Sequence, residues 1–179
     1  MGNACSDPRV VGLWKEFVFE RYEVDFNKRN DILCDFIPYA HSRMSYDSAM
    51  LIAKQMRVLW DFFCTDPMSE HMKQAESLWN GCEQTFLDKL NSEELECYQL
   101  LETAELQDVF RICRDLAFCE KGKVGQFFLS SRNLGLRLGK EHTRAWQKLR
   151  QMKRLRIIQE LIKGTRGSTG SATTFEWSL

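Results

Sequence analysis

Apolar side chains recur every three or four residues through the first two thirds of the chain, which is the spacing of amphipathic helices. The clearest run follows Asp66-Pro67, which we interpret as the cap and the first-turn proline of a helix. Its apolar positions are Met72, Ala75, Trp79, Cys82, Phe86 and Leu90. This segment is predicted to be one helix with a single buried face.

Shorter helices are expected on either side of this run. A helix followed by an extended stretch is expected before residue 30, and a helix over 32–40 that Pro38 stops or kinks. Ser45 is suited to cap a helix over 46–63. Asn91 with Glu94 has the spacing of a capping box for a helix over 92–101, and Thr103 opens another that carries Leu106, Phe110, Cys113 and Ala117.

The pattern changes after residue 125. Residues 126–129 are predicted to form an edge strand, and Ser130 or Ser131 to cap a helix that bears Leu134, Leu136 and Leu138. Gly139 is suited to a left-handed turn into a second helix over 141–154, whose inward positions are Ala145, Leu149 and Met152. A strand over 157–162, a loop over 163–172 and a strand over 173–177 follow. This order predicts a winged helix-turn-helix domain.

The second of these helices is rich in polar and basic side chains. Its polar positions are His142, Thr143, Arg144, Gln147, Lys148, Arg150, Lys153 and Arg154. Arginine and glutamine hydrogen-bond to purine edges, whereas other cations hold phosphates. We assign base readout to Thr143, Arg144 and Gln147. Phosphate contacts are assigned to Lys148, Arg150 and Lys153. The strands over 157–162 and 173–177 and the loop between them form the predicted wing. Its loop adds Lys163 and Arg166 beside glycines, which permit close approach to the DNA backbone.

Charge divides the chain unevenly. Residues 1–120 hold 12 Lys+Arg against 22 Asp+Glu, and residues 121–179 hold 13 against 3, so the halves carry about −10 and +10. We therefore expect an acidic helical domain over 8–120, a linker near residues 120–125 and a basic winged-helix domain over 124–179. The split also suggests that the acidic half inhibits DNA binding by the basic half.

The residues that carry other chemistry favour a cytoplasmic protein without catalytic activity. The seven cysteines form no CxxC pair, and we expect them to be reduced and mostly buried. Three separated histidines are interpreted as surface or capping residues. No phosphate loop, nucleophile elbow or paired catalytic carboxylates are present, so no metal or other cofactor is expected. No apolar run is long enough for a membrane span.

One N-terminal pattern leaves a different possibility open. Residues 1–6 match the myristoylation pattern, with Gly2 as the acceptor and Cys5 available for a second acyl chain. A lipid-anchored adaptor is therefore a third hypothesis.

The C-terminal segment resembles the winged-helix region that follows helical regions in bacterial and phage primase-polymerases and plasmid replication proteins. The resemblance rests on Leu138-Gly139, His142-Thr143, Ala145-Trp146, Ile157-Ile158 and Lys163-Gly164. Upstream, residues 29–118 look like the helical region of that group, and a catalytic primase domain is missing. Such domains commonly place glycine where this chain has Arg156, which implies a less tight turn or an added phosphate contact.

These features together predict a DNA-binding regulator of transcription or a replication accessory factor. The resemblance implies a bacterial cytoplasm, with duplex DNA as the partner of the basic domain. The helical domain is expected to form a homodimer or to contact a replication protein. The alternative is an interaction module whose winged helix docks a protein, because this fold serves both purposes.

Overall fold

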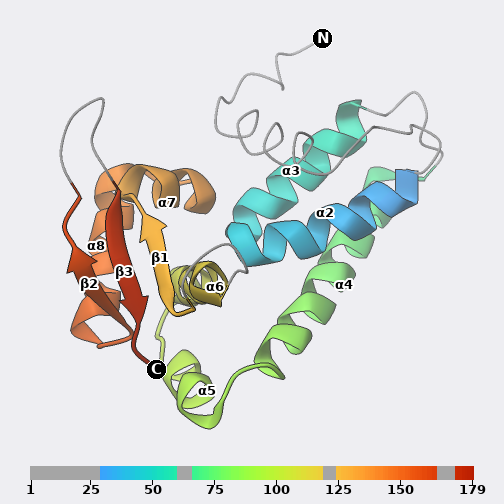
Figure 1. Cartoon of the computed structure of the whole chain (residues 1–179). Helices are drawn as coiled ribbons and strands as arrows, with labels where there is room; N and C mark the ends of the chain where they lie inside the picture. The colour runs from blue at the N-terminus through green and yellow to red at the C-terminus, as the bar shows by residue number, and fades with distance from the viewer. Residues whose placement is uncertain (1–28, 60–65, 119–123, 165–171) are drawn as a thin grey trace. The chain divides into compact units, whose positions relative to one another are not determined.

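The computed structural model describes residues 29–59, 66–118, 124–164 and 172–179 (Figure 1). Within these ranges the chain is mainly helical and contains one three-stranded antiparallel sheet. The elements expected before residue 29 lie outside the described residues. The chain divides into two compact units, Met1–Lys89 and Leu90–Leu179, so the boundary falls about thirty residues before the one that charge suggested.

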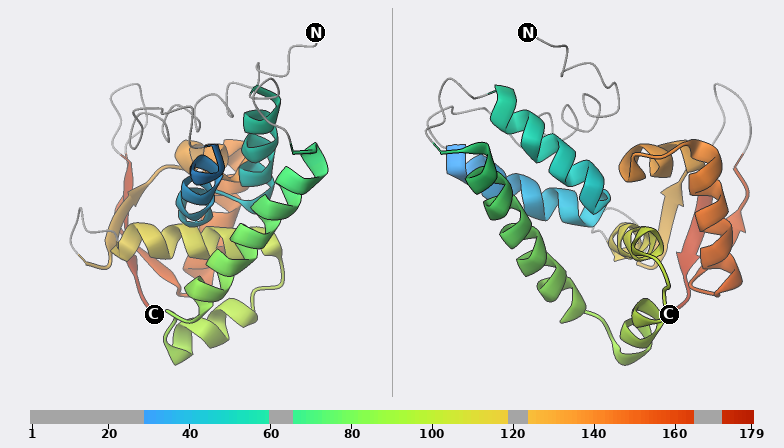
Figure 2. Two further views of the ribbon diagram at one scale, coloured as in Figure 1. Left: turned by 90° about the vertical axis from the view of Figure 1, so that its right-hand side faces the viewer. Right: turned by 180° about the vertical axis from the view of Figure 1, so that it is seen from behind.

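The first unit contains α2 (Arg29–Arg43), α3 (Tyr46–Leu59) and α4 (Met68–Leu87), and α4 packs against both α2 and α3 (Figure 2). Its core gathers Phe36, Ile37, Ile52, Met56 and Trp79, with Met72 and Cys82 partly buried against it. The amphipathic pattern of α4 is thus confirmed up to residue 87. Leu90, which the pattern included, follows the helix.

Two expectations about helix ends in this unit are wrong. Pro38 does not stop α2, since the helix continues to Arg43, and the other alternative, a kink at Pro38, stays a prediction. Pro38 lies at an exposed position of the helix. Water can therefore hydrogen-bond to the carbonyl four residues earlier, to which proline has no N–H to donate. Pro67 is the N-cap residue of α4 rather than its first-turn residue, and no side chain caps that helix. The Asp66 carbonyl instead accepts hydrogen bonds from Arg57, the nearer from Nη2 at 2.6 Å.

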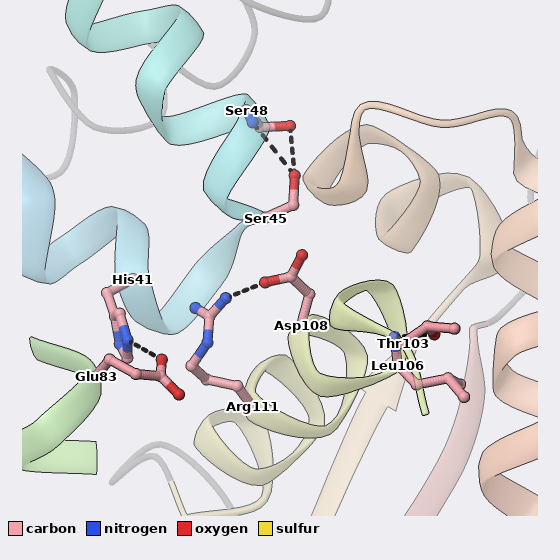
Figure 3. A network of polar contacts seen from close by, with 8 residues as sticks. All are labelled: His41, Ser45, Ser48, Glu83, Thr103, Leu106, Asp108 and Arg111. Carbon is pink, nitrogen blue, oxygen red and sulfur yellow. Dashed lines mark hydrogen bonds and ion pairs between the residues drawn. The ribbon is translucent and has the colours of Figure 1, made fainter. Parts of the chain in front are cut away.

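The cap of α3 and one buried histidine are visible in the same view. The Ser48 amide donates to Ser45 Oγ at 3.2 Å, which confirms the predicted cap (Figure 3). His41 is only 5% exposed, and its Nε2 lies 2.8 Å from Glu83 Oε2, so its interpretation as a surface residue is wrong. Its ring also packs against Trp79, with the ring centroids 4.7 Å apart.

The second unit begins with α5 (Ser92–Gln99) and α6 (Ala104–Phe118). Asn91 and Glu94 form the expected capping box, with the Glu94 amide 2.9 Å from Asn91 Oδ1. Thr103 Oγ1 accepts the Leu106 amide at 3.3 Å, so it caps α6 as predicted (Figure 3). Both caps act within one helical turn and could therefore be predicted from the local sequence.

The rest of the second unit follows the predicted order of elements. It comprises β1 (Gln126–Leu129), α7 (Ser131–Leu138), α8 (His142–Arg154), β2 (Ile158–Ile162) and β3 (Thr173–Trp177). The strands are ordered β1-β3-β2, which confirms β1 as an edge strand. Ser130 accepts the Asn133 amide at 3.1 Å and so caps α7. Phe127 and Phe175 stack across neighbouring strands with their ring centroids 5.7 Å apart.

Helix α6 is part of this second unit, because it packs against β1, β3, α7 and α8. Figure 2 shows it beside the sheet. Phe110 and Cys113 on α6 are fully buried. The predicted linker ends at Gly125, whose N–H donates to the Ala117 carbonyl at 2.8 Å and whose carbonyl accepts the Trp177 amide at 2.7 Å. A fragment that starts at Val124 would therefore lack a helix that this unit is built around.

The boundary between Lys89 and Leu90 gives the two units a different charge balance from the predicted domains. Residues 90–179 hold 15 Lys+Arg against 11 Asp+Glu, a net charge of +4, and residues 1–89 hold 10 against 14. The large charge separation noticed in the sequence therefore lies mostly inside the second unit. Acidic α5 and α6 and basic α8 belong to the same compact body.

The cysteines differ from expectation. Of the four in the described ranges, all are free, but only Cys113 is buried, whereas Cys34 is exposed and Cys82 and Cys97 are half-buried. Complete burial raises the pKa of the Cys113 thiol to about 12. Cys5, Cys64, Cys119 and Gly2 lie outside the described residues. Within residues 29–59, 66–118, 124–164 and 172–179, no helix combines the length and apolar character of a membrane span.

Candidate nucleic-acid interface

A tight turn joins α7 to α8 and sets how closely the two helices approach. Gly139 has φ +65°, and the amides of Gly139 and Lys140 return to the carbonyls of Leu136 and Gly135 at 3.2 and 2.8 Å. This is the Schellman arrangement that a left-handed glycine permits. A Cβ on Gly135 would lie 2.8 Å from the Lys140 carbonyl oxygen, so only glycine fits at this contact.

Helix α8 places a row of polar side chains opposite its buried face. Ala145, Leu149 and Met152 are buried, as predicted. The side chains on the opposite side of the helix are spaced by four, three and four residues, and all four are exposed: Thr143, Gln147, Arg150 and Arg154. Within the described part of the chain, none of these four forms an ion pair. We call Thr143, Gln147, Arg150 and Arg154 the outer row.

Two of the predicted contact residues point instead toward α6. Arg144 donates to both carboxylate oxygens of Glu105, with Nε 2.9 Å from Oε1 and Nη2 2.9 Å from Oε2. Lys148 Nζ lies 3.5 Å from the same Oε2. Burial raises the pKa of Glu105, but the hydrogen bonds and charges of Arg144 and Lys148 outweigh it, so the pKa is lower than usual. The same contacts raise the pKa of Arg144. Glu105 is therefore charged at neutral pH.

The remaining predicted contact residues are spread around the unit. Lys153 is half-buried and its Nζ lies 2.7 Å from Glu160 Oε2 on β2. His142 is exposed in the first turn of α8, and Lys163 is exposed just after β2. Arg166 lies outside the described residues. The structure therefore groups the nine predicted residues that it describes into the outer row, a pair held by Glu105 and a more scattered set.

Arg156 forms the turn that follows α8. Its φ is +59°, and among the described residues it is the one residue other than glycine with positive φ. The amides of Arg156 and Ile157 donate to the carbonyls of Lys153 and Met152, each at 3.1 Å. This is again a Schellman turn, so the expectation of a less tight turn at this position is wrong.

Sequence reasoning did not find two residues that shape this surface. Gly135 lies within the predicted helix that bears Leu134, Leu136 and Leu138, but the sequence pattern assigns it no role, although the tight helix contact depends on it. Glu105 was placed in the acidic domain, 39 positions before Arg144. Neither residue lies in a local motif that marks its role, because both roles arise from contacts between helices.

No known family, curated protein or solved structure matches this chain. The likeness to replication proteins therefore remains an expectation from a few residues. Among the residues that the structure describes, no group of three or more His, Cys, Asp and Glu side chains is placed to hold a metal ion. The candidate interface therefore rests on the structure itself, above all on the geometry and charge of α8.

Proposed function

We propose that the second unit is a winged helix that binds duplex DNA by placing α8 in the major groove. The proposal is supported by the order helix, strand, helix, turn, helix and β-hairpin from α6 to β3, with the strand order β1-β3-β2. In this interpretation α6 is the first helix of the winged helix, α7 the second and α8 the recognition helix. The β2–β3 hairpin is the wing.

The outer row is the observation that carries the proposal. Thr143 and Arg154 are eleven residues apart, which corresponds to about 16 Å along a helix, or roughly five base-pair steps. A helix of about 10–12 Å diameter fits the major groove, which is about 12 Å wide. Gln147 offers the paired donor and acceptor that match adenine, and Arg150 the paired donors that match guanine.

The outer row also changes the roles that the sequence suggested. Arg150, assigned to phosphate contacts, lies beside Thr143 and Gln147 on the side of α8 away from its buried stripe. Arg144, assigned to base readout, lies on the flank that contacts α6. We therefore propose Thr143, Gln147 and Arg150 for readout. Phosphate contacts are assigned to Arg154 and Lys163, with His142 at the edge of the interface.

The biological role that fits this proposal is that of a replication accessory factor or a transcriptional regulator without catalytic activity. The DNA-binding second unit is joined to the compact first unit, and this arrangement fits such a role because the first unit can recruit a partner. We propose that the first unit contacts either a second copy of this chain or a replication protein. Sedimentation of the chain alone distinguishes these two partners, because only self-association changes its mass.

Fluorescence anisotropy with a labelled random-sequence duplex tests DNA binding directly. The full chain is expected to bind at low salt, with an affinity that falls steeply as salt rises because bound cations replace condensed counterions. The double variant Gln147→Ala, Arg150→Ala is expected to lose severalfold in affinity for this random-sequence duplex, because it removes an exposed cation that faces the DNA and can neutralise a phosphate. Lys54→Ala removes the same single charge from an exposed position on α3 and is the matched control.

The outcomes separate DNA binding from its main alternative. Equal losses in the double variant and in Lys54→Ala would show that α8 is not the contact surface. If the chain does not bind duplex even at the lowest salt, DNA binding is refuted and docking of a protein becomes the better explanation. Exposed Phe128 and Ile162, which both pair with Thr174 in the sheet, would then be the first surface to examine.

A further inference from the structure

Glu105 on α6 faces two of the cations that flank the outer row. We propose that Glu105 is a positioning residue that withholds Arg144 and Lys148 from DNA phosphates, and so lowers sequence-independent DNA binding. This inference rests on the proposed function of α8. It adds a regulatory element to that function, namely one carboxylate that reduces the contribution of two basic side chains.

The geometry shows that this carboxylate is well placed to compete with phosphate. The Glu105 side chain is 15% exposed, as is Lys148, whereas Arg144 is 58% exposed. Arg144 uses two donors on two carboxylate oxygens, which is the same paired geometry with which arginine binds phosphate. A phosphate can therefore recruit this edge of the guanidinium only by displacing Glu105.

The position of Glu105 in its own helix strengthens the competition. Glu105 is in the first turn of α6, where the helix dipole favours a negative charge. The carboxylate also remains ionised, because its cationic partners lower its pKa. If a phosphate took both cations, Glu105 would be left half-buried, charged and without them. That loss opposes every phosphate contact that requires Arg144 or Lys148 to leave Glu105.

Selective DNA binding benefits from such restraint. Phosphate contacts supply nearly all of non-specific binding, and the many non-specific sites in a genome compete with the target. Withholding two cations weakens that background. It leaves the outer row free for base contacts, because none of its members pairs with Glu105. Glu105 would therefore raise the ratio of specific to non-specific affinity while lowering total affinity.

The variant Glu105→Gln tests this inference in the full chain, with random-sequence duplex as the probe. It keeps the shape of the side chain and removes its charge. We expect affinity to rise about three- to tenfold at low salt, and the slope of log affinity against log salt to steepen by about 1–2, since each newly neutralised phosphate adds about 0.9. The control is Glu102→Gln, which removes the same charge from an exposed position before α6.

Two further comparisons show whether the effect passes through the withheld cations. In an Arg144→Ala, Lys148→Ala background, Glu105→Gln is expected to leave both affinity and salt slope close to those of the background. In the otherwise unchanged chain, Arg144→Ala is expected to weaken binding less than twofold, whereas Arg150→Ala weakens it severalfold. This comparison does not require any change at Glu105.

Failure of the inference is distinguishable from failure of the proposed function. Absence of duplex binding by the unchanged chain would refute both. If the chain binds but Glu105→Gln behaves like Glu102→Gln, Glu105 does not withhold the cations. If Glu105→Gln weakens binding, or if Arg144→Ala costs as much as Arg150→Ala, then Glu105 instead orients Arg144 toward DNA, and the inference is wrong.

Discussion

Trp177 Nε1 donates a hydrogen bond of 3.1 Å to Glu94 Oε1, although 83 positions separate the two residues. The same carboxylate accepts hydrogen bonds from Nε and Nη2 of Arg114 at 2.8 and 2.9 Å. It also accepts one from the backbone amide of Asn91 at 3.0 Å. Glu94 is 1% exposed. One buried carboxylate thus ties α5, α6 and β3 together and explains why α5 belongs to the second unit.

Glu94→Gln is expected to destabilise the protein by about 3 kcal/mol. The amide would lose the charge that pairs with Arg114 and would turn a donor toward the donors of Arg114 or Trp177, and breaking a buried charged network has a large cost. Urea unfolding followed by circular dichroism measures the change. Glu93→Gln, at an exposed position on the same helix, should change stability by less than about 0.5 kcal/mol. Equal effects of the two variants would contradict a structural role for the network.

The same carboxylate makes stability depend on pH. Burial raises the pKa of Glu94, but hydrogen bonds from Arg114, Asn91 and Trp177 and the Arg114 charge lower it below its usual 4.5. The unfolded chain therefore binds the proton more readily, and the stabilisation is complete above about pH 4.5. It is lost as the pH falls through the lower pKa of the folded state.

Unfolding free energies measured between neutral pH and pH 3 test this dependence. The unfolding free energy of the unchanged chain should fall steeply below pH 4.5, the ordinary glutamate pKa. The unfolding free energy of Glu94→Gln should decline less steeply over the same range. The pKa of Glu105 is also lowered, so part of the acid sensitivity should persist in that variant. Parallel profiles for the unchanged chain and Glu94→Gln would show that other groups control the acid transition.

Gly135 and Gly81 lie inside helices but are expected to respond to alanine in opposite directions. A Cβ on Gly135 would be 2.8 Å from the Lys140 carbonyl oxygen, whereas one on Gly81 meets nothing within 4 Å. Gly135→Ala should therefore cost about 1–3 kcal/mol through overpacking. Gly81→Ala should stabilise α4 by about 0.5–1 kcal/mol, because alanine loses less backbone entropy in a helix. Thermal unfolding measures both, and two changes of the same sign would contradict the close approach of α7 to α8.

The parts of the fold that could be predicted are those set by neighbouring residues. Ser130 caps α7 and Asn91 caps α5 through contacts that span three residues. The turn at Gly139 likewise follows from the conformational freedom of one residue. The buried stripe of α8 follows from its helical period. Such signals are complete within one or two helical turns.

The domain boundary and the arrangement of the site depend on contacts that are distant in sequence. Charge placed α6 with the acidic helices, yet Phe110 and Cys113 bury it in the second unit. The position of Arg144 early in α8 predicts base readout, but the orientation of its side chain depends on Glu105. The sequence around Glu105 does not indicate which cation its carboxylate contacts. Long-range packing therefore decided both the boundary and the roles of the basic residues.

Arg156→Gly is expected to stabilise the protein by about 1 kcal/mol. Arg156 holds φ +59° in the turn that ends α8, and a left-handed conformation costs an ordinary residue roughly 1–2 kcal/mol, which glycine avoids. The preceding Leu155 has right-handed geometry at φ −76°, so Leu155→Gly should instead destabilise by about 0.5–1 kcal/mol. Urea unfolding of both variants makes the comparison.

Arg156→Gly also removes the guanidinium of Arg156, so a parallel DNA titration separates the role of the turn from a phosphate contact. A gain in stability with unchanged DNA affinity assigns Arg156 to the turn alone. A shallower slope of log affinity against log salt shows that Arg156 also contacts phosphate.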